Sequence, residues 1–514
     1  MEQKSNYIKN HKKNYILHKF MQYRRLLLYP FIIFSIFKMK GINAKLNSIQ
    51  TENIYDLEEQ RKIFDYELVA KNPHLVTDYF FKIINDASKL NLFLFEKNVQ
   101  KLKEKIYLII DNKDRYKDSY AILSSIFGAF LADSMGSSTE FMQKGKENHL
   151  YIYNETNYRF RPGQITDDSE MAMSQAFAIL DNYQYKTLNP NLLYYYYVLW
   201  YKSNPLDIGT TTRNGLSYLD IEKVNINDEN IFTEKIKSKI SIKNSGSLAN
   251  GFLMRASPLL TWFYMVHKSY IIEILKSQSS EKYLELYKNI HAELAKDTQL
   301  THPNPETAVS GSIIIFMGLC SMRKIYTGKE VLEKVKILFE NNYFGDELNE
   351  SEYKIKKHFY EVLKEFSKPY FSKDEFFGNL YEEMGFYKHA FNLTLYYLNV
   401  FDEQKKTMNL KDIYTNMMFD ISDFGGDTDT NGAIVGMVMG PLIGMENFDR
   451  KYFDIFLSFY SRDRLIYTNV LMFYYAKYLE LIQDDGLYIE KDKYDVNYNV
   501  IDILIKMINT EINW

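Results

Sequence analysis

The stretch FGGDTDTN, residues 424–431, places two carboxylates and two threonine hydroxyls within four residues, directly ahead of a run of small apolar residues. Glycines at positions 432, 436, 440 and 444 leave one face of the following segment without bulk, and Gly128, Ala132 and Gly136 repeat that spacing. Glycine inside a helix lowers its stability by about 1 kcal/mol relative to alanine, so the repeated glycines on both faces require a structural explanation. They predict two closely packed helices, the second kinked or ended by Pro441.

A second acidic segment, Thr166-Asp167-Asp168-Ser169, lies about 260 residues before the first. Carboxylate and hydroxyl oxygens are the ligands that Mg²⁺ and Mn²⁺ prefer. A capped helix start is the alternative, because Asp167 as N-cap and Glu170 three residues later would form a capping box. Adjacent carboxylates repel one another, however, and a helix N-terminus supplies only about half a positive charge, whereas a divalent ion supplies two.

Other segments indicate a polar ligand. Asp207–Arg213 (DIGTTTR) offers backbone N–H groups, hydroxyls and a cation to a phosphate. Ser247–Arg255 places polar side chains beside a glycine, and His302 stands in a turn bounded by prolines, where a structural role is the alternative. Glu140 is expected on one helical face with Asp133, from which it could meet both acidic segments.

Two adjacent divalent ions would bind vicinal hydroxyls and lower the pKa of a coordinated water, which suits attack at an anomeric carbon or a phosphoryl group. The chain contains no Walker-type phosphate loop, no histidine-rich zinc spacing and no Gly-x-Ser-x-Gly elbow. These absences argue against nucleoside triphosphatases, zinc hydrolases and serine hydrolases.

The chain as a whole reads as a helical protein. Glycine (22) and proline (10) are scarce among 514 residues, and apolar residues recur mostly at helical spacing. Residues 151–153 are the best candidate for a strand, and the charged segment 220–244 is predicted to be a loop. We predict an N-terminal extension of uncertain order at 1–117, a compact domain at 118–485 and a C-terminal tail at 486–514.

Composition limits the kinds of binding partner and the compartment that can be expected. With 63 basic and 66 acidic side chains the net charge is −3, which gives no sign of nucleic-acid or acidic-lipid binding. The single cysteine, Cys320, excludes a disulfide within the chain and favours a reducing compartment, so we expect a cytoplasmic protein. The apolar run 26–37 is too short to span a bilayer, and we favour a packed or poorly ordered extension over a targeting segment. We expect no membrane span, and a monomer is the default.

Seven segments, in this order, resemble the ADP-ribosylglycohydrolase family. They are Gly128–Phe141 (GAFLADSMGSSTEF), Ile165–Glu170 (ITDDSE), Asp207–Arg213 (DIGTTTR), Ser247–Pro258 (SLANGFLMRASP), Thr301–Pro305 (THPNP), Gly385–Phe391 (GFYKHAF) and Gly425–Gly436 (GGDTDTNGAIVG). The resemblance covers about residues 120–450. Two departures, Ala132 for a usual glycine and Ser169 for a frequent threonine, remove no expected ligand.

The resemblance implies a compact, orthogonal, all-α multi-helix domain around a central binuclear metal cleft with two Mg²⁺ ions, Mn²⁺ being possible. It implies hydrolysis of the glycosidic bond between ADP-ribose and a modified protein side chain, arginine or serine. The implied metal ligands are Thr166, Asp167, Asp168, Asp427, Asp429 and Thr430. Catalysis would fall to Glu140 and Asp168, with Glu140 coordinating a metal or orienting the attacking water. The implied ADP-ribose contacts are Gly209, Thr210, Ser247, Asn250, Gly251 and His302.

Two alternatives stay open. The chain could hydrolyse a small ADP-ribose ester and take no protein substrate, which product analysis would distinguish. It could also be a non-catalytic descendant, since the resemblance extends to certain lens crystallins. Loss of the acidic ligands would mark such a descendant, and here all of them are present.

Overall fold

A computed structural model describes residues 104–458, except 105, 116, 146, 154–159, 183–184, 203–204, 220–229, 324 and 341–349. All of these residues belong to one compact unit, Val99–Tyr498. Within these ranges the protein is helical and has no strand, and one isolated bridge joins Ala249 to Phe386. The prediction of an all-α protein is therefore confirmed.

The elements in chain order are α6 (Lys117–Gly136), η3 (Asn148–Tyr151), α7 (Asp167–Asp181), α8 (Pro190–Lys202), α9 (Thr210–Leu216), α10 (Glu234–Asn244), α11 (Ser257–Ser277), α12 (Ser280–Thr298), α13 (Pro305–Met322), α14 (Gly328–Glu340), α15 (Glu350–Phe366), α16 (Lys373–Phe377), α17 (Tyr387–Thr407), α18 (Leu410–Phe424), α19 (Thr428–Ile443), η6 (Met445–Asn447) and α20 (Arg450–Ser458).

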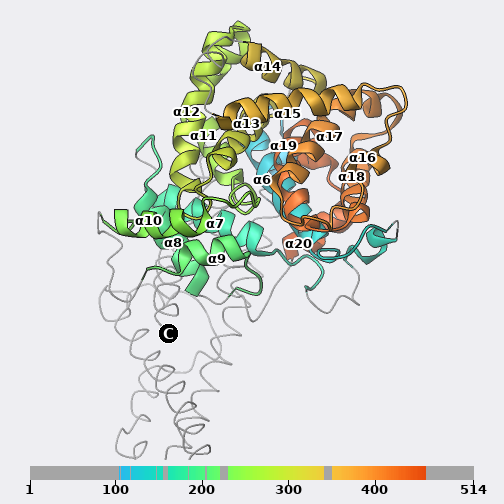
Figure 1. Ribbon diagram of the computed structural model, residues 1–514. Coiled ribbons are helices and arrows are strands. Elements are labelled where there is room, and N and C mark those ends of the chain that lie inside the picture. The colour runs from blue at the N-terminus through green and yellow to red at the C-terminus, as the bar shows by residue number, and fades with distance from the viewer. Residues whose placement is uncertain are drawn as a thin grey trace, which may run out of the picture. The chain divides into compact units, whose positions relative to one another are not determined.

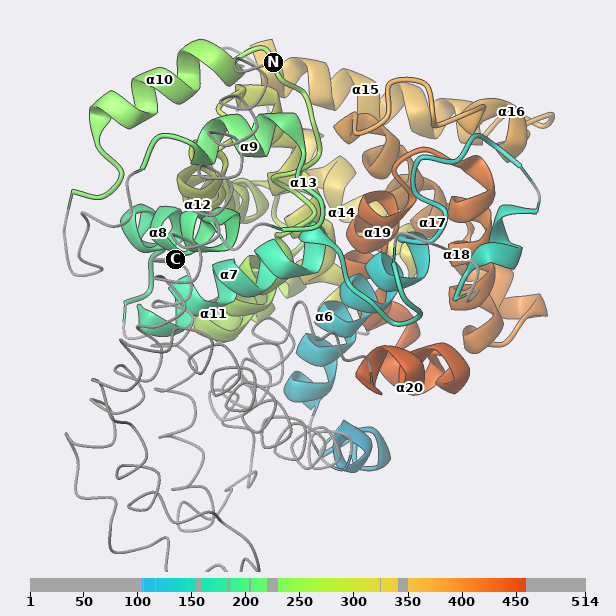
Figure 2. The ribbon, with the colours of Figure 1, turned by 90° about the horizontal axis from the view of Figure 1, so that it is seen from below.

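Helices α6 and α19 form the centre of the domain and lie side by side in both ribbon views (Figures 1 and 2). They run antiparallel, because Gly128 faces Gly436 while Gly136 faces Thr428. A Cβ added to Gly136 would lie 2.5 Å from the Thr428 carbonyl oxygen, and one on Gly128 would collide with the Gly436 carbonyl. The predicted close packing is thus confirmed, and α19 ends two residues after Pro441.

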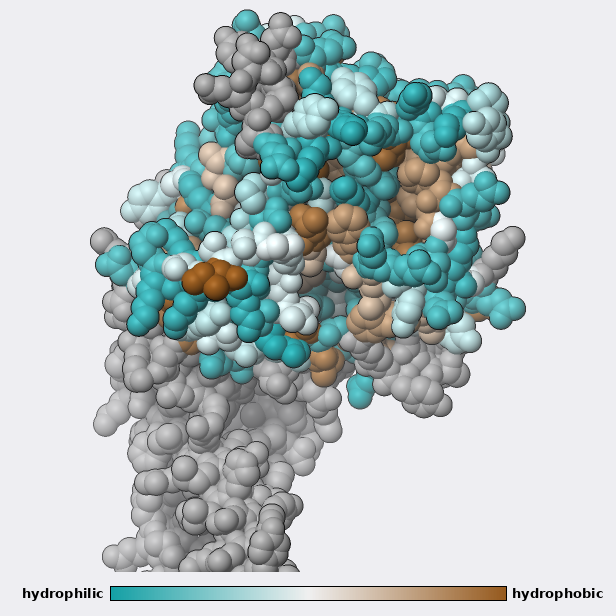
Figure 3. Space-filling model, in the orientation of Figure 1, coloured by the Kyte–Doolittle hydropathy of each residue, from teal (hydrophilic) through white to brown (hydrophobic). Residues whose placement is uncertain are grey.

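Helix α13 packs against this pair and is buried along nearly its whole length. It is the one helix within the described ranges that is long and apolar enough to cross a membrane, a property that was not predicted from the sequence. Burial inside the domain is what a core helix shows, and Cys320 on it is fully buried. On the face seen in Figure 3 the surface is largely hydrophilic.

Two local predictions were wrong. Residues 234–244, predicted to be part of a loop, form α10, whose buried Ile236 and Ile240 are one turn apart and so anchor an otherwise charged helix. Its first turn is capped by Thr233, whose hydroxyl accepts from the Ile236 N–H. Residues 151–153 form the end of η3 and a turn, not a strand.

The predicted tail at 486–514, the apolar run at 26–37 and most of the predicted extension at 1–117 lie outside the described residues. The described part of that extension packs on the domain. Ile106 and Ile109 are fully buried, and the Tyr107 hydroxyl donates to the Asp454 carboxylate at 2.6 Å.

Candidate metal centre

The first acidic segment opens α7. The Thr166 hydroxyl accepts from the Asp168 backbone N–H at 3.3 Å and lies 2.9 Å from an Asp168 carboxylate oxygen, to which it donates. From α6, the carboxylate of Asp133 accepts from the backbone N–H groups of Thr166 and Ser169, each at 3.2 Å, and from the Ser169 hydroxyl. A side chain from another helix therefore accepts from two of the N–H groups at this helix start.

The capping box predicted for this segment does not form. Helix α7 begins at Asp167, so Asp167 is its first residue and not its N-cap. Glu170 points elsewhere, and its carboxylate accepts from the Trp200 indole N–H at 2.7 Å. A capping box therefore does not explain the adjacent carboxylates of Asp167 and Asp168.

The second acidic segment opens α19 and meets the first. The Thr430 hydroxyl donates to Asp168 Oδ1 at 2.9 Å, so residues 262 positions apart share a hydrogen bond. Asp427 is the N-cap residue, but its side chain makes no capping bond to α19. Instead it accepts from the Asn250 amide at 2.6 Å. Gly426, with φ of 78°, precedes it and lies so close to the Leu380 carbonyl that no side chain would fit.

Glu140 reaches the same place from a turn. Helix α6 ends at Gly136, so the predicted helical face shared by Asp133 and Glu140 was wrong. Phe141 N–H donates to the Gly426 carbonyl at 2.8 Å, and Gly426 N–H donates to Met142 at the same distance. These bonds hold Phe141 in the left-handed region, with φ of 65°, and fix the half-buried Glu140 beside α19.

Two overlapping sets of carboxylates result, each with its oxygens within 4.8 Å of one another. One comprises Asp133, Asp168 and Asp429, and the other Glu140, Asp427 and Asp429. We call these five residues together with Asp167 the acidic cluster. Asp429 belongs to both sets, which is the arrangement expected of a residue between two adjacent cations.

Burial raises the pKa of every aspartate in the cluster, and repulsion from other cluster members adds to it for Asp167, Asp168 and Asp429. Burial is the largest cause for all of them, and it brings the pKa of Asp133 to about 6. The negative charge of Asp429 adds to the effect on Asp168, and that of Asp427 adds to the effect on Asp429. Within the described ranges none of these five aspartates pairs with a basic side chain. A divalent cation would supply the missing positive charge, so the donor set fits one.

The predicted ligand contacts divide into two groups. Asn250 is bonded to Asp427, and Gly251 lies against the ring of the buried His302, so these three adjoin the cluster. Gly209 and Thr210 are exposed at the start of α9.

Ser247 is partly exposed, and its hydroxyl lies 2.8 Å from that of Thr211 on α9. Asp207, which precedes α9, raises the pKa of Asp167 by repulsion and so faces the cluster.

Sequence reasoning missed Asp133 and Asp207 as neighbours of the cluster. Asp207 was noted only as the start of a phosphate-binding segment, and Asp133 only for its helical face. The signal for Asp133 was its place one turn before Gly136, in a helix that the glycine pattern already paired with α19. A carboxylate at this position of α6 lies beside the starts of α7 and α19.

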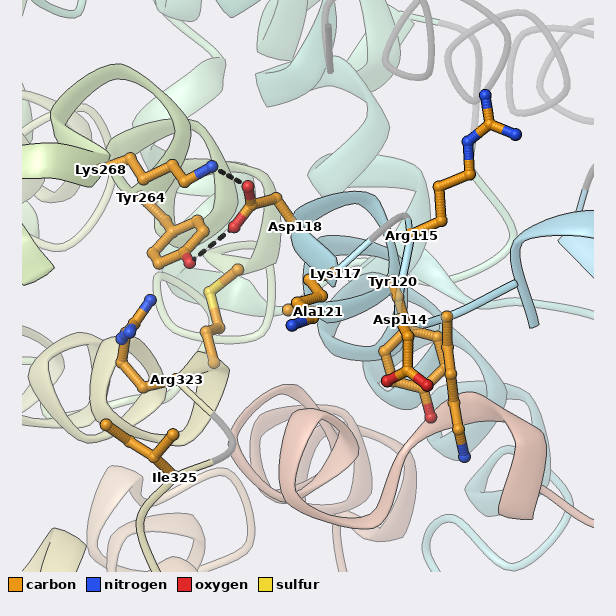
Figure 4. A pocket seen from close by; sticks show the side chains of 12 residues that line it. Asp114, Arg115, Lys117, Asp118, Tyr120, Ala121, Tyr264, Lys268, Arg323 and Ile325 are labelled. Carbon is orange, nitrogen blue, oxygen red and sulfur yellow. Dashed lines mark hydrogen bonds and ion pairs between the residues drawn. The ribbon is translucent and has the colours of Figure 1, made fainter. Parts of the chain in front are cut away.

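A separate cavity of about 660 Å³ opens near the start of α6 (Figure 4). Asp118 on its wall bonds to Lys268 and, at 3.0 Å, to the Tyr264 hydroxyl. Asp118 precedes Asp133 by fifteen helical positions, or roughly 22 Å at 1.5 Å per residue. This cavity is therefore distinct from the acidic cluster.

Comparison with known proteins assigns the chain to a family. The model of the ADP-ribosylglycohydrolase family matches residues 112–464. A protein of Acanthamoeba polyphaga mimivirus named as an ADP-ribosyl glycohydrolase is 30% identical over 346 residues, which are 62% of this chain and 86% of that protein. The ADP-ribosyl-(dinitrogen reductase) glycohydrolase of Rhodospirillum rubrum is 33% identical over 99 residues, 18% of this chain and 33% of its own length.

Among solved structures, an ADP-ribosylglycohydrolase-related protein complex aligns with a TM-score of 0.44 and 16% identity, covering 70% of this chain and 98% of its own. The assignment to a family rests on the family match and on the mimivirus relative. The chain belongs to the ADP-ribosylglycohydrolase family and is a hydrolase of glycosidic bonds.

Proposed function

We propose that this protein is a Mg²⁺- or Mn²⁺-dependent hydrolase that cleaves the bond between the anomeric carbon of ADP-ribose and a modified protein side chain, arginine or serine. The observation that carries the proposal is the acidic cluster, in which two segments 260 positions apart meet through the bond from Thr430 to Asp168. Family membership supports the ADP-ribose part of the substrate. The catalytic domain would be residues 118–485.

Six residues would hold two cations. They are Thr166, Asp167, Asp168, Asp427, Asp429 and Thr430. When bound, divalent cations hold vicinal hydroxyls and lower the pKa of a water molecule. Asp133 would act indirectly, since its carboxylate fixes the start of α7 and with it the direction of Asp168. Asn250 would do the same for Asp427.

Glu140 and Asp168 would handle the attacking water. Glu140 is half-buried, and one of its carboxylate oxygens lies within 4.8 Å of those of Asp427 and Asp429, so it can orient a water molecule and accept its proton. Asp168 accepts from two threonine hydroxyls, which hold its carboxylate in one orientation. Gly209, Thr210, Ser247, Asn250, Gly251 and His302 would line the ADP-ribose pocket.

The test is release of free ADP-ribose from arginine-modified and serine-modified peptides, with Mg²⁺ and then with excess EDTA. We expect release from one of the peptides, and its loss with EDTA. Asp114→Asn is a matched control, because this exposed carboxylate lies outside the cluster. Release that persists in EDTA would overturn the metal requirement. Release from neither peptide, but from an ADP-ribose ester, would exclude a protein substrate.

A further inference from the structure

A fully buried ion pair is linked through Thr301 to His302, one of the proposed ADP-ribose contacts. Arg255 and Asp297 are both 0% exposed, and the guanidinium donates to Asp297 Oδ2 from Nε at 3.0 Å and from Nη2 at 2.9 Å. The other carboxylate oxygen accepts from the Tyr197 hydroxyl and, at 3.2 Å, from the Gln175 amide. Arg255 Nη2 also donates to the Thr301 hydroxyl at 2.9 Å. The network thus extends to Thr301.

The Thr301 hydroxyl connects Arg255 to His302, because its oxygen lies 2.8 Å from His302 Nδ1. A guanidinium can only donate, so the Thr301 oxygen accepts from Arg255 and keeps its own single hydrogen. Thr301 is fully buried, and a buried hydroxyl hydrogen without an acceptor is costly. Nδ1 is the acceptor in reach. A neutral imidazole whose Nδ1 accepts carries its hydrogen on Nε2.

The surroundings keep the ring neutral and leave that hydrogen available. Burial, and then the charge of Arg255, hold the pKa of His302 well below its usual value. His302 Nε2 is buried and has no hydrogen-bond partner within the described part of the chain. A buried donor without a partner is rare and calls for an explanation, and a bound ligand would provide one.

Gly251 marks where that ligand would lie. A Cβ added to Gly251 would be 3.2 Å from His302 Nε2 and 3.1 Å from the Thr212 hydroxyl oxygen, so the absence of a side chain keeps both groups clear. The preceding residue, Asn250, is bonded to Asp427 of the acidic cluster. The unpartnered N–H of His302 therefore faces Gly251, the residue directly after one that touches the cluster.

We propose that Arg255, acting through Thr301, is a positioning residue that fixes His302 as the Nε2–H tautomer. The Nε2–H then donates to a hydroxyl or phosphate oxygen of the ADP-ribose where it passes Gly251, with the Thr212 hydroxyl beside it. This inference rests on the proposed function for the identity of the ligand. The tautomer itself does not depend on it.

The test uses the full chain labelled with ¹⁵N-histidine, the His302 signals being assigned by their loss in His302→Gln. The wild-type protein at neutral pH should show a protonated Nε2 and an unprotonated Nδ1. Thr301→Ser retains the hydroxyl and should keep this tautomer. Thr301→Val removes it and should change the Nδ1 signal. Binding of ADP-ribose should weaken roughly tenfold in Thr301→Val, the effect of one lost hydrogen bond, and less than threefold in Thr301→Ser.

The outcomes separate the two claims. A protonated Nδ1 in the wild-type protein would overturn the positioning role, whatever the ligand and even if a variant fails to fold. Equal ADP-ribose affinity in Thr301→Val and the wild-type protein would overturn it as well. The expected tautomer together with no ADP-ribose binding by the wild-type protein would instead contradict the proposed function, and with it the ligand named here.

Discussion

Replacing Asp297 with asparagine should destabilise the domain by about 3–5 kcal/mol, the usual cost of leaving one partner of a buried ion pair uncompensated. Both side chains are 0% exposed, so water cannot solvate the Arg255 guanidinium that remains. An asparagine amide cannot replace the carboxylate. Its NH₂ group would face either the Arg255 donors on one side or the donors of Tyr197 and Gln175 on the other.

The assay is urea unfolding followed by circular dichroism. The comparison variants are Arg255→Met, the double variant Arg255→Met with Asp297→Leu, and Glu403→Gln, which removes surface ion pairs with Lys329 and Lys406. The double variant should be more stable than Asp297→Asn, since it buries no unpaired charge. Glu403→Gln should change stability by less than about 1 kcal/mol. A loss below about 1 kcal/mol for Asp297→Asn would refute the reasoning.

Three further outcomes are expected. Gly436→Ala should lower the free energy of unfolding in urea by about 3 kcal/mol, because the added Cβ meets the backbone of α6. Gly246→Ala, with open space around the added Cβ, should lower it by less than about 1 kcal/mol. Equal effects of the two substitutions would contradict the close packing of α6 and α19. Asp429→Asn should abolish ADP-ribose release without loss of helical circular dichroism, and full activity would refute the proposed place of Asp429 between two cations. In the metal-free fold the pKa of Asp133 is raised from 3.8 to about 6, so stability of about 3 kcal/mol present at low pH is lost as pH rises through that window. The increase in Tm on adding Mg²⁺ should therefore be larger at pH 7.5 than at pH 5, and a constant increase would contradict this.

The parts of the site that could be predicted from the sequence are those formed by residues next to one another in the chain. Both acidic segments are short runs whose composition indicates a site for a hard cation. The glycine spacing in α6 and α19 directly predicts that these two helices pack closely. Asp427 and Asp429 could therefore be proposed from the sequence. Their meeting with Asp168 also requires the start of α7 to be held against α6 by Asp133, a contact that the glycine spacing does not indicate.

The parts that escaped it depend on contacts between distant residues. Glu170 has the spacing of a capping box, but Trp200 from the next helix takes its carboxylate, and Asp133 caps α7 instead. Glu140 reaches the cluster through a turn held by Gly426, which helical periodicity cannot predict. The environment of His302 likewise depends on Arg255, 47 positions away in sequence.

The most direct test of the metal centre is the number of Mn²⁺ ions bound per chain at saturation, measured by equilibrium dialysis of the wild-type protein, Asp429→Asn and Asp114→Asn. The two overlapping carboxylate sets predict two ions for the wild-type protein and for Asp114→Asn. Because Asp429 belongs to both sets, its variant should bind fewer. No bound Mn²⁺ in the wild-type protein, or the same number in all three, would contradict a binuclear centre at the acidic cluster.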